Sequence, residues 1–225
     1  MEKMIFLCYW IVLVSLFGIY VINRCIIKRT SNKIEEKTSR ISYNELEKRC
    51  VQYLKKNNIN NVRLEFSRNY CFDLKNNSLK IVKKQEYTKY DIFICYHEIG
   101  HIIDFNNRYN RIYKLIAKAK TVFYILWIPI LCISLSMIFE NLQVQSIVFA
   151  LNLLEIGAGV LIIGTSGFIE YNASKCAISN FEFVNNEEKL ELSKVAKLCA
   201  CEQTIYWAIA ILPLFFILYI IVLGH

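Results

Sequence analysis

The sequence of 225 residues contains little proline, glycine or histidine. It has two prolines, seven glycines and three histidines. So few prolines and glycines argue against an all-β fold and against flexible linkers, and they favour a mainly α fold. The nine cysteines are odd in number and have no framework spacing, so we expect reduced thiols. With 55% hydrophobic and 20% charged residues, the chain is neither disordered nor fibrous.

The apolar residues are concentrated in four long blocks. A helix in a soluble core is apolar on one face only, whereas these blocks are apolar all round. At the helical rise per residue, the first block spans about 28 Å, close to the hydrocarbon thickness of a bilayer. We therefore predict a polytopic membrane protein with four transmembrane helices, at residues 4–22, 121–139, 146–169 and 205–223.

The first block lacks the small-x-small cleavage site of a signal peptide. Four basic residues follow it at once, which favours a retained anchor over an exported leader. The second and third blocks are separated only by the polar turn 140–145, which predicts an antiparallel membrane hairpin. The basic residues after the anchor are Arg24, Lys28, Arg29 and Lys33.

The distribution of Lys and Arg predicts the orientation in the membrane. Of the 27 cations, 22 lie in residues 23–120 and 4 in residues 170–204, which leaves only Lys3 elsewhere. By the positive-inside rule both polar segments face the cytoplasm, and both termini lie outside. No basic stripe interleaves with aromatics, so we expect the bilayer as a partner and no nucleic acid. The predicted segments are an anchor (1–23), a cytoplasmic domain (24–120), a hairpin (121–169), a second cytoplasmic segment (170–204) and a final span (205–225).

The polar segments carry local structure signals. Ser42 and Glu45 form a capping box, which predicts a helix from Tyr43. Alternation at 62–66 and the run 78–82 predict a small two-stranded element. Further helices are predicted at about 89–106, with Thr88 as a cap, and at 187–199 as an amphipathic surface helix. The first helix should bury one face made of Leu46, Cys50, Tyr53 and Leu54.

The helix predicted at 89–106 contains the pattern His-Glu-x-x-His. His97 and His101, four residues apart, share one helix face and can reach a single zinc ion. Glu98 can take a proton from a zinc-activated water and pass it to a leaving amine. The third histidine is the last residue of the chain. The pattern therefore predicts a catalytic zinc site with Glu98 as general base.

A catalytic zinc site needs a third protein ligand. A metzincin would have Gly and then His or Asp where this chain has Asp104 and Asn107, so that class is excluded. An intramembrane protease would place the motif in a long apolar span, and the chain has no Leu-Asp-Gly partner motif. A glutamate on another helix remains, and Glu170 follows the third span. The short side chain of Asp104 favours an orienting role or exposure to solvent over ligation.

With Glu170-Tyr171-Asn172-Ala173-Ser174 as a second motif, the chain resembles the YugP-like bacterial membrane zinc metallopeptidases, and more distantly the gluzincins. Phe72-Asp73 before a short strand, the anchor, the hairpin and the last span extend the likeness over nearly the whole chain. The resemblance implies a zincin-like domain with Zn²⁺ held by His97, His101 and Glu170. It implies Glu98 as the base, and Ser174 and Asn172 as residues that orient the ligands. The chain departs from the family pattern at Cys71, Leu74, Ile102 and Asp104.

These observations predict a zinc metallopeptidase of the bacterial cell membrane. Its substrates would be membrane proteins or membrane-proximal peptides, cleaved on the cytoplasmic face. The alternative is a membrane scaffold or binding protein that holds zinc and hydrolyses nothing, although an intact Glu98 argues against it. Glu155, in the third span, is either a protonated, hydrogen-bonded helix contact or a residue of substrate passage.

Overall fold

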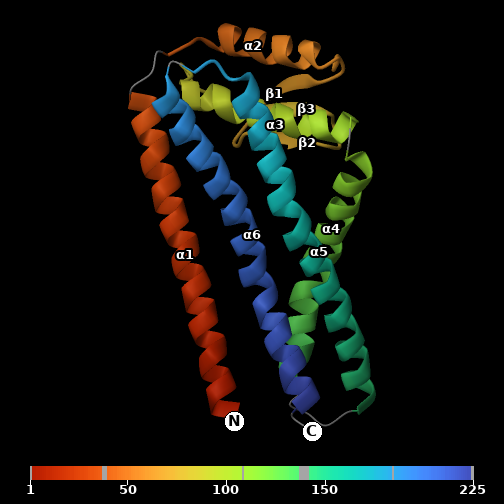
Figure 1. The fold of residues 1–225 in the computed structure, drawn as a ribbon. Coiled ribbons are helices and arrows are strands. Elements are labelled where there is room, and N and C mark those ends of the chain that lie inside the picture. The colour runs from red at the N-terminus through yellow and green to blue at the C-terminus, as the bar shows by residue number, and fades with distance from the viewer. Residues whose placement is uncertain (1, 37–39, 108, 137–141, 184, 224–225) are drawn as a thin grey trace. The chain divides into compact units, whose positions relative to one another are not determined.

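A computed structural model describes residues 2–36, 40–107, 109–136, 142–183 and 185–223. These residues are mostly helical, with one small sheet, which confirms the predicted mainly α class (Figure 1). The helices are α1 (Glu2–Glu36), α2 (Tyr43–Lys56), α3 (Lys89–Asn107), α4 (Asn110–Ser136), α5 (Leu142–Asn180) and α6 (Asn186–Leu223), and the strands are β1 (Arg63–Ser67), β2 (Cys71–Asp73) and β3 (Ser78–Val82).

The chain forms two compact units. We call residues 1–22, 111–167 and 201–225 the apolar unit, and residues 23–110 and 168–200 the polar unit. The helices α1, α5 and α6 each have a part in both units, and α4 has only its first residue, Asn110, in the polar unit.

The apolar unit has a core of aromatic and aliphatic side chains. Trp207 of α6 packs edge-on against Phe123 of α4, and the Nε1–H of Trp127 donates to the carbonyl of Ala210 at 3.1 Å. A Cβ atom on Gly159 of α5 would lie 2.3 Å from Ile211, so this glycine allows close helix packing. The other buried members of the core are Ala119, Ile156, Ile162 and Leu214.

Glu155 of α5 is fully buried in the apolar unit. Neither of its carboxylate oxygens has a hydrogen-bond partner in the described part of the chain. The hydrogen-bonded helix contact considered for this residue is therefore not present among the described residues.

Three described helices are long and apolar enough to cross a membrane, and not the four that we predicted. They contain residues 7–35 of α1, 149–180 of α5 and 186–216 of α6. The block expected at 121–139 lies in α4, whose first half carries Arg111, Lys114, Lys118 and Lys120. Its apolar part begins only after these cations and ends in the sequence at Phe139. Residues 137–141, which include the start of the turn 140–145, lie outside the described residues.

Two of the candidate membrane spans, α5 and α6, continue as helices beyond their apolar blocks. Residues 170–180 extend α5, and the amphipathic stretch 187–199 forms the start of α6 and not a separate surface helix. The change in hydropathy marks a change of surroundings, whereas the backbone hydrogen bonds continue because neither residues 170–180 of α5 nor residues 187–205 of α6 contain proline or glycine. Glu170 is thus on the same helix as the third apolar block.

The polar unit combines α2, α3 and a three-stranded sheet. β3 is central, parallel to β1 and antiparallel to the edge strand β2. The sequence predicted two of these strands and missed β2. The start of α2 is confirmed, since Ser42 Oγ accepts a hydrogen bond from the Glu45 N–H at 3.3 Å. The predicted face of α2 is buried as expected and joins a core with Leu79, Ile81, Tyr87, Ile99 and Ile102.

Candidate metal centre

A polar network fixes the start of α3, the helix that carries the two histidines. The hydroxyl of Thr88 accepts from the Asp91 N–H at 3.3 Å, and the Asp91 carboxylate accepts from the Thr88 N–H at 2.8 Å. Tyr70 and Lys84 each donate to the same carboxylate at 2.7 Å. This reciprocal cap confirms that α3 begins after Thr88.

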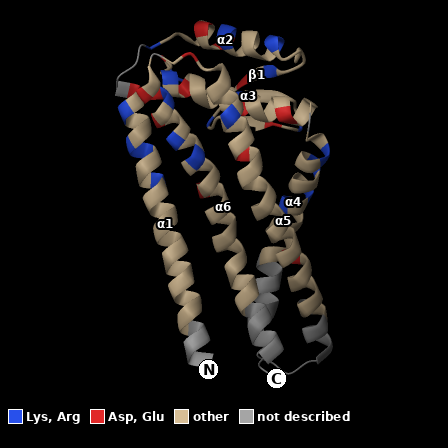
Figure 2. Ribbon diagram, viewed as in Figure 1, with Lys and Arg blue, Asp and Glu red and all other residues tan. Residues whose placement is uncertain are grey.

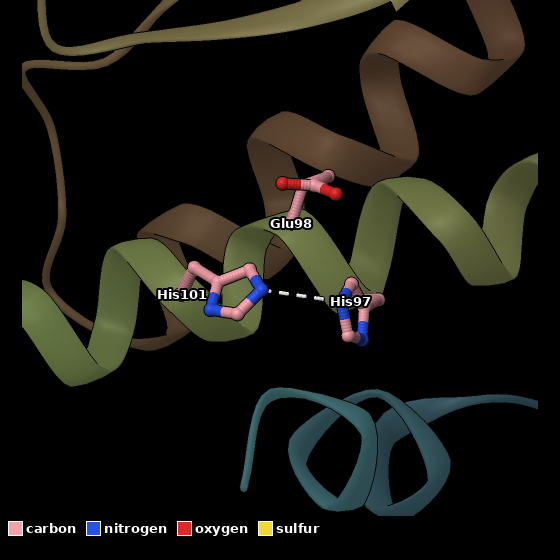
Figure 3. A group of neighbouring side chains, drawn as sticks. All are labelled: His97, Glu98 and His101. Carbon is pink, nitrogen blue, oxygen red and sulfur yellow. Dashed lines mark hydrogen bonds between the residues drawn. The ribbon is translucent and has the colours of Figure 1, made fainter. Parts of the chain in front are cut away.

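His97 and His101 lie on one face of α3, as the sequence predicted. Their Nε2 atoms are 3.1 Å apart and the ring planes are nearly perpendicular, at 86° (Figure 3). Both side chains are largely shielded from solvent, with 14% and 11% of their surface exposed. Two imidazole nitrogens this close in a sheltered position form a pair of donors for one metal ion.

Glu170 of α5 supplies a third donor atom at the same point. Its Oε2 lies 3.1 Å from Nε2 of His97 and 3.6 Å from Nε2 of His101. A tetrahedral zinc ion with bonds of about 2.0–2.1 Å requires ligand atoms about 3.3 Å apart. The two nitrogens and the oxygen form such a triangle, so these residues fit a zinc ion with three protein ligands.

Ser174 contacts the outer nitrogen of His97. Its Oγ lies 3.0 Å from Nδ1, one turn of α5 after Glu170. An Nδ1–H that donates to Ser174 leaves Nε2 unprotonated and turned toward the metal position, which is the tautomer a ligand needs. Asn172, the other α5 residue expected to orient a ligand, makes no hydrogen bond in the part of the chain that the structure describes.

The charges around His101 favour its protonated form when no metal is present. Burial lowers the pKa of His101, but the hydrogen bond and the negative charge of Glu170 outweigh it and raise the pKa above its usual value. Glu98 and Asp104 add to this effect. Asp104 is buried one turn after His101, so it influences the site through its charge.

Glu98 lies beside the triangle of donor atoms, and a hydrogen bond from strand β2 of the sheet holds its carboxylate. Its Oε2 accepts a hydrogen bond from the backbone N–H of Phe72 at 2.8 Å. One donor atom from each of His97, Glu98 and His101 lies within 4.8 Å of the others. The sequence gave no sign of the Phe72 contact, because β2 was not predicted.

Two histidines and a glutamate from a second helix, with a further glutamate beside them, are the donor set of the zinc peptidases that carry His-Glu-x-x-His. The chain belongs to one family of this class: residues 9–224 match the family model described as "Putative neutral zinc metallopeptidase". This match is consistent with the YugP-like resemblance noted from the sequence. Searches of curated proteins and of solved structures give no significant match.

Proposed function

We propose that the protein is a membrane-embedded zinc metallopeptidase that hydrolyses peptide bonds of membrane or membrane-proximal proteins. The observation that carries this proposal is the triangle of His97 Nε2, His101 Nε2 and Glu170 Oε2, with Glu98 beside it. A purely structural zinc site would close its fourth position and would not need a neighbouring carboxylate. Family membership supports the peptidase class.

Glu98 acts as the general base in this proposal. Its Oε2 is occupied by the Phe72 N–H, while Oε1 makes no hydrogen bond among the described residues. Oε1 is therefore the atom that accepts a proton from the attacking water and later returns it to the leaving amine. When bound, zinc supplies a Lewis acid that lowers the pKa of water and polarises the scissile carbonyl. The hydrogen bond from Phe72 keeps the carboxylate in place between the two proton transfers.

The membrane-proximal substrate class follows from the position of Glu170. It lies on α5, a candidate membrane span, so the metal centre belongs to a helix that also enters the bilayer. We propose that the site faces the cytoplasm and that both termini are outside, because 26 of 27 cations lie in the two polar segments.

Metal removal and restoration tests the proposal. Protein purified in detergent should contain about one zinc per chain and cleave a casein or peptide-library substrate. A chelator should abolish cleavage, and added zinc should restore it. His101→Gln should lose both zinc and activity. His225→Gln makes the same chemical change at the histidine outside the motif and should keep both. One zinc per chain without cleavage of any substrate bond would favour the non-catalytic scaffold.

A further inference from the structure

A polar pocket lies between α1 and α6 within the polar unit. None of the proposed zinc ligands lines it. Its volume is about 510 Å³. Its walls are fixed, because Ile34 of α1 and Leu192 of α6 are buried in the same core, and Lys33 forms an ion pair with Glu191. The residues that line it are Arg29, Thr30, Asn32 and Lys33 of α1 and Glu191 and Lys194 of α6.

The charge in this pocket is mostly positive and only partly compensated. Three cations and one carboxylate line it. Lys33 is satisfied by Glu191 and, at 3.8 Å, by Glu187. Arg29 and Lys194 are exposed and make no ion pair in the described part of the chain. An unpaired guanidinium and an unpaired ammonium from two helices that line one pocket, together with the hydroxyl of Thr30 in the same lining, suit an anionic oxygen ligand such as a phosphate.

If α1 crosses the membrane, the pocket lies just beyond the headgroup layer, and its long basic side chains can reach that layer. The first apolar block ends seven residues before Arg29, which is about 10 Å along the helix. The headgroup layer extends about 5–8 Å beyond the hydrocarbon on each side, and long basic side chains bend toward it. In Figure 2 the Lys and Arg residues of α1 gather toward its C-terminal end, and none is drawn on the tan stretch that precedes them.

We propose that this pocket binds the phosphate headgroup of an anionic phospholipid, of the phosphatidylglycerol class. The position beside two candidate membrane spans favours a lipid over a free phosphate ion, because a lipid brings its phosphate to this depth. Arg29 and Lys194 bind the phosphate oxygens, and Thr30 and Asn32 donate further hydrogen bonds. The inference rests on membrane insertion of α1 and α6 and not on peptidase activity, so the two can fail separately.

Lipid binding to the delipidated full-length protein in detergent tests this proposal. Native mass spectrometry should show phosphatidylglycerol bound with about tenfold or greater preference over phosphatidylcholine of the same acyl chains. The double variant Arg29→Gln/Lys194→Gln should weaken phosphatidylglycerol binding by about tenfold or more, since two cations at a membrane surface are removed. Lys55→Gln/Arg68→Gln removes the same charge from exposed positions elsewhere in the polar unit and should bind as the wild type does.

Inorganic phosphate distinguishes the two sources of the anion. An equal concentration of phosphate should not displace the lipid, and displacement would assign the pocket to free phosphate and overturn the proposal. Equal lipid binding by the pocket variant and the wild type would also overturn it. A thermal melt of each variant without lipid shows whether it is folded. If the double variant is unfolded, Lys194→Gln alone takes its place, with an expected loss of about threefold or more.

Discussion

Gly100 of α3 lies directly against the backbone of Ala173 of α5. A Cβ atom at position 100 would be 2.6 Å from the Ala173 carbonyl oxygen and 2.8 Å from its Cα. The contact involves backbone atoms, which cannot move aside as a flexible side chain would. It lies in the middle of the His97–His101 motif and between Glu170 and Ser174, so the absence of a side chain at position 100 lets the two halves of the metal centre meet.

Gly100→Ala should therefore separate α3 from α5 and open the triangle of donor atoms. We expect a loss of stability of about 1–3 kcal/mol, as in overpacked cores, and a fall in zinc affinity of at least tenfold. Gly157→Ala is the matched control, because a Cβ atom there meets nothing within 4 Å and alanine favours the helix. Thermal melts and zinc titrations measure both effects, and unchanged zinc affinity in Gly100→Ala would show that the close approach is not needed.

Comparing Glu170→Ala with Asp104→Ala distinguishes a residue that binds the zinc ion from one that only influences a zinc ligand. Removing the third donor should reduce zinc affinity by more than about 100-fold. Asp104 influences His101 by its charge, and its loss should cost less than about tenfold. Equilibrium dialysis against a zinc buffer measures both affinities. Full zinc retention by Glu170→Ala, together with loss in Asp104→Ala, would reverse the ligand assignment.

Asp91 should make the stability of the polar unit depend on pH. Burial raises the pKa of its carboxyl, but the hydrogen bonds from Lys84, Thr88 and Tyr70 outweigh burial and lower the pKa below its usual value. A group with a lowered folded pKa stabilises the fold above its unfolded value, about 3.9, and that contribution is lost as the pH falls through the folded value. At pH 7 Asp91→Asn should be less stable by about 2 kcal/mol.

The difference between the wild type and Asp91→Asn should shrink as the pH falls below about 4. Thermal melts in detergent between pH 7 and the acid limit of solubility measure it. Glu86→Gln breaks an exposed ion pair with Arg40 and should change stability by less than about 0.5 kcal/mol at every pH. A pH-independent difference for Asp91→Asn would mean that lost packing, and not charge, causes it.

The proposed orientation can be tested by labelling single cysteines in a cysteine-free variant. A cysteine at Gln143 should react with an impermeant maleimide in intact cells, whereas one at Gln85, an exposed residue of the polar unit, should react only after lysis. The asymmetry of the cations is the physical reason. Labelling at Gln85 alone would place the metal centre outside the cell. Labelling at both positions would show that Gln85 and Gln143 lie on the same side of the membrane.

Local signals in the sequence were sufficient for much of the polar unit. The capping residues Ser42 and Thr88 and the spacing of the α2 apolar face identified both helices, because these patterns act within one or two turns. The motif placed His97, Glu98 and His101 together for the same reason. Glu170 lies on another helix, and only elimination and family resemblance indicated it before the structure brought its carboxylate to the histidines.

Features that depend on tertiary contacts were not predictable. The three-residue strand β2 is too short to show a periodicity, so the hydrogen bond from Phe72 to Glu98 was missed. The extension of α5 and α6 beyond their apolar blocks was missed because hydropathy reports the surroundings and not the end of a helix. The block at 121–139 was counted as a span from hydropathy alone, and the described part of α4 does not satisfy the length and apolarity of the other three.

The most direct test of the central claim compares the wild type with Glu98→Gln at equal zinc content. Glutamine keeps the size of the side chain and leaves the three proposed ligands unchanged, so zinc should stay near one per chain. Glutamine cannot accept the proton that Glu98 Oε1 would take from the attacking water. Hydrolysis of a peptide library, followed by mass spectrometry, should fall by about 10²–10⁴-fold. Glu86→Gln, with the same chemical change at the surface, should cleave as the wild type does. Undiminished cleavage by fully zinc-loaded Glu98→Gln would contradict the proposed mechanism.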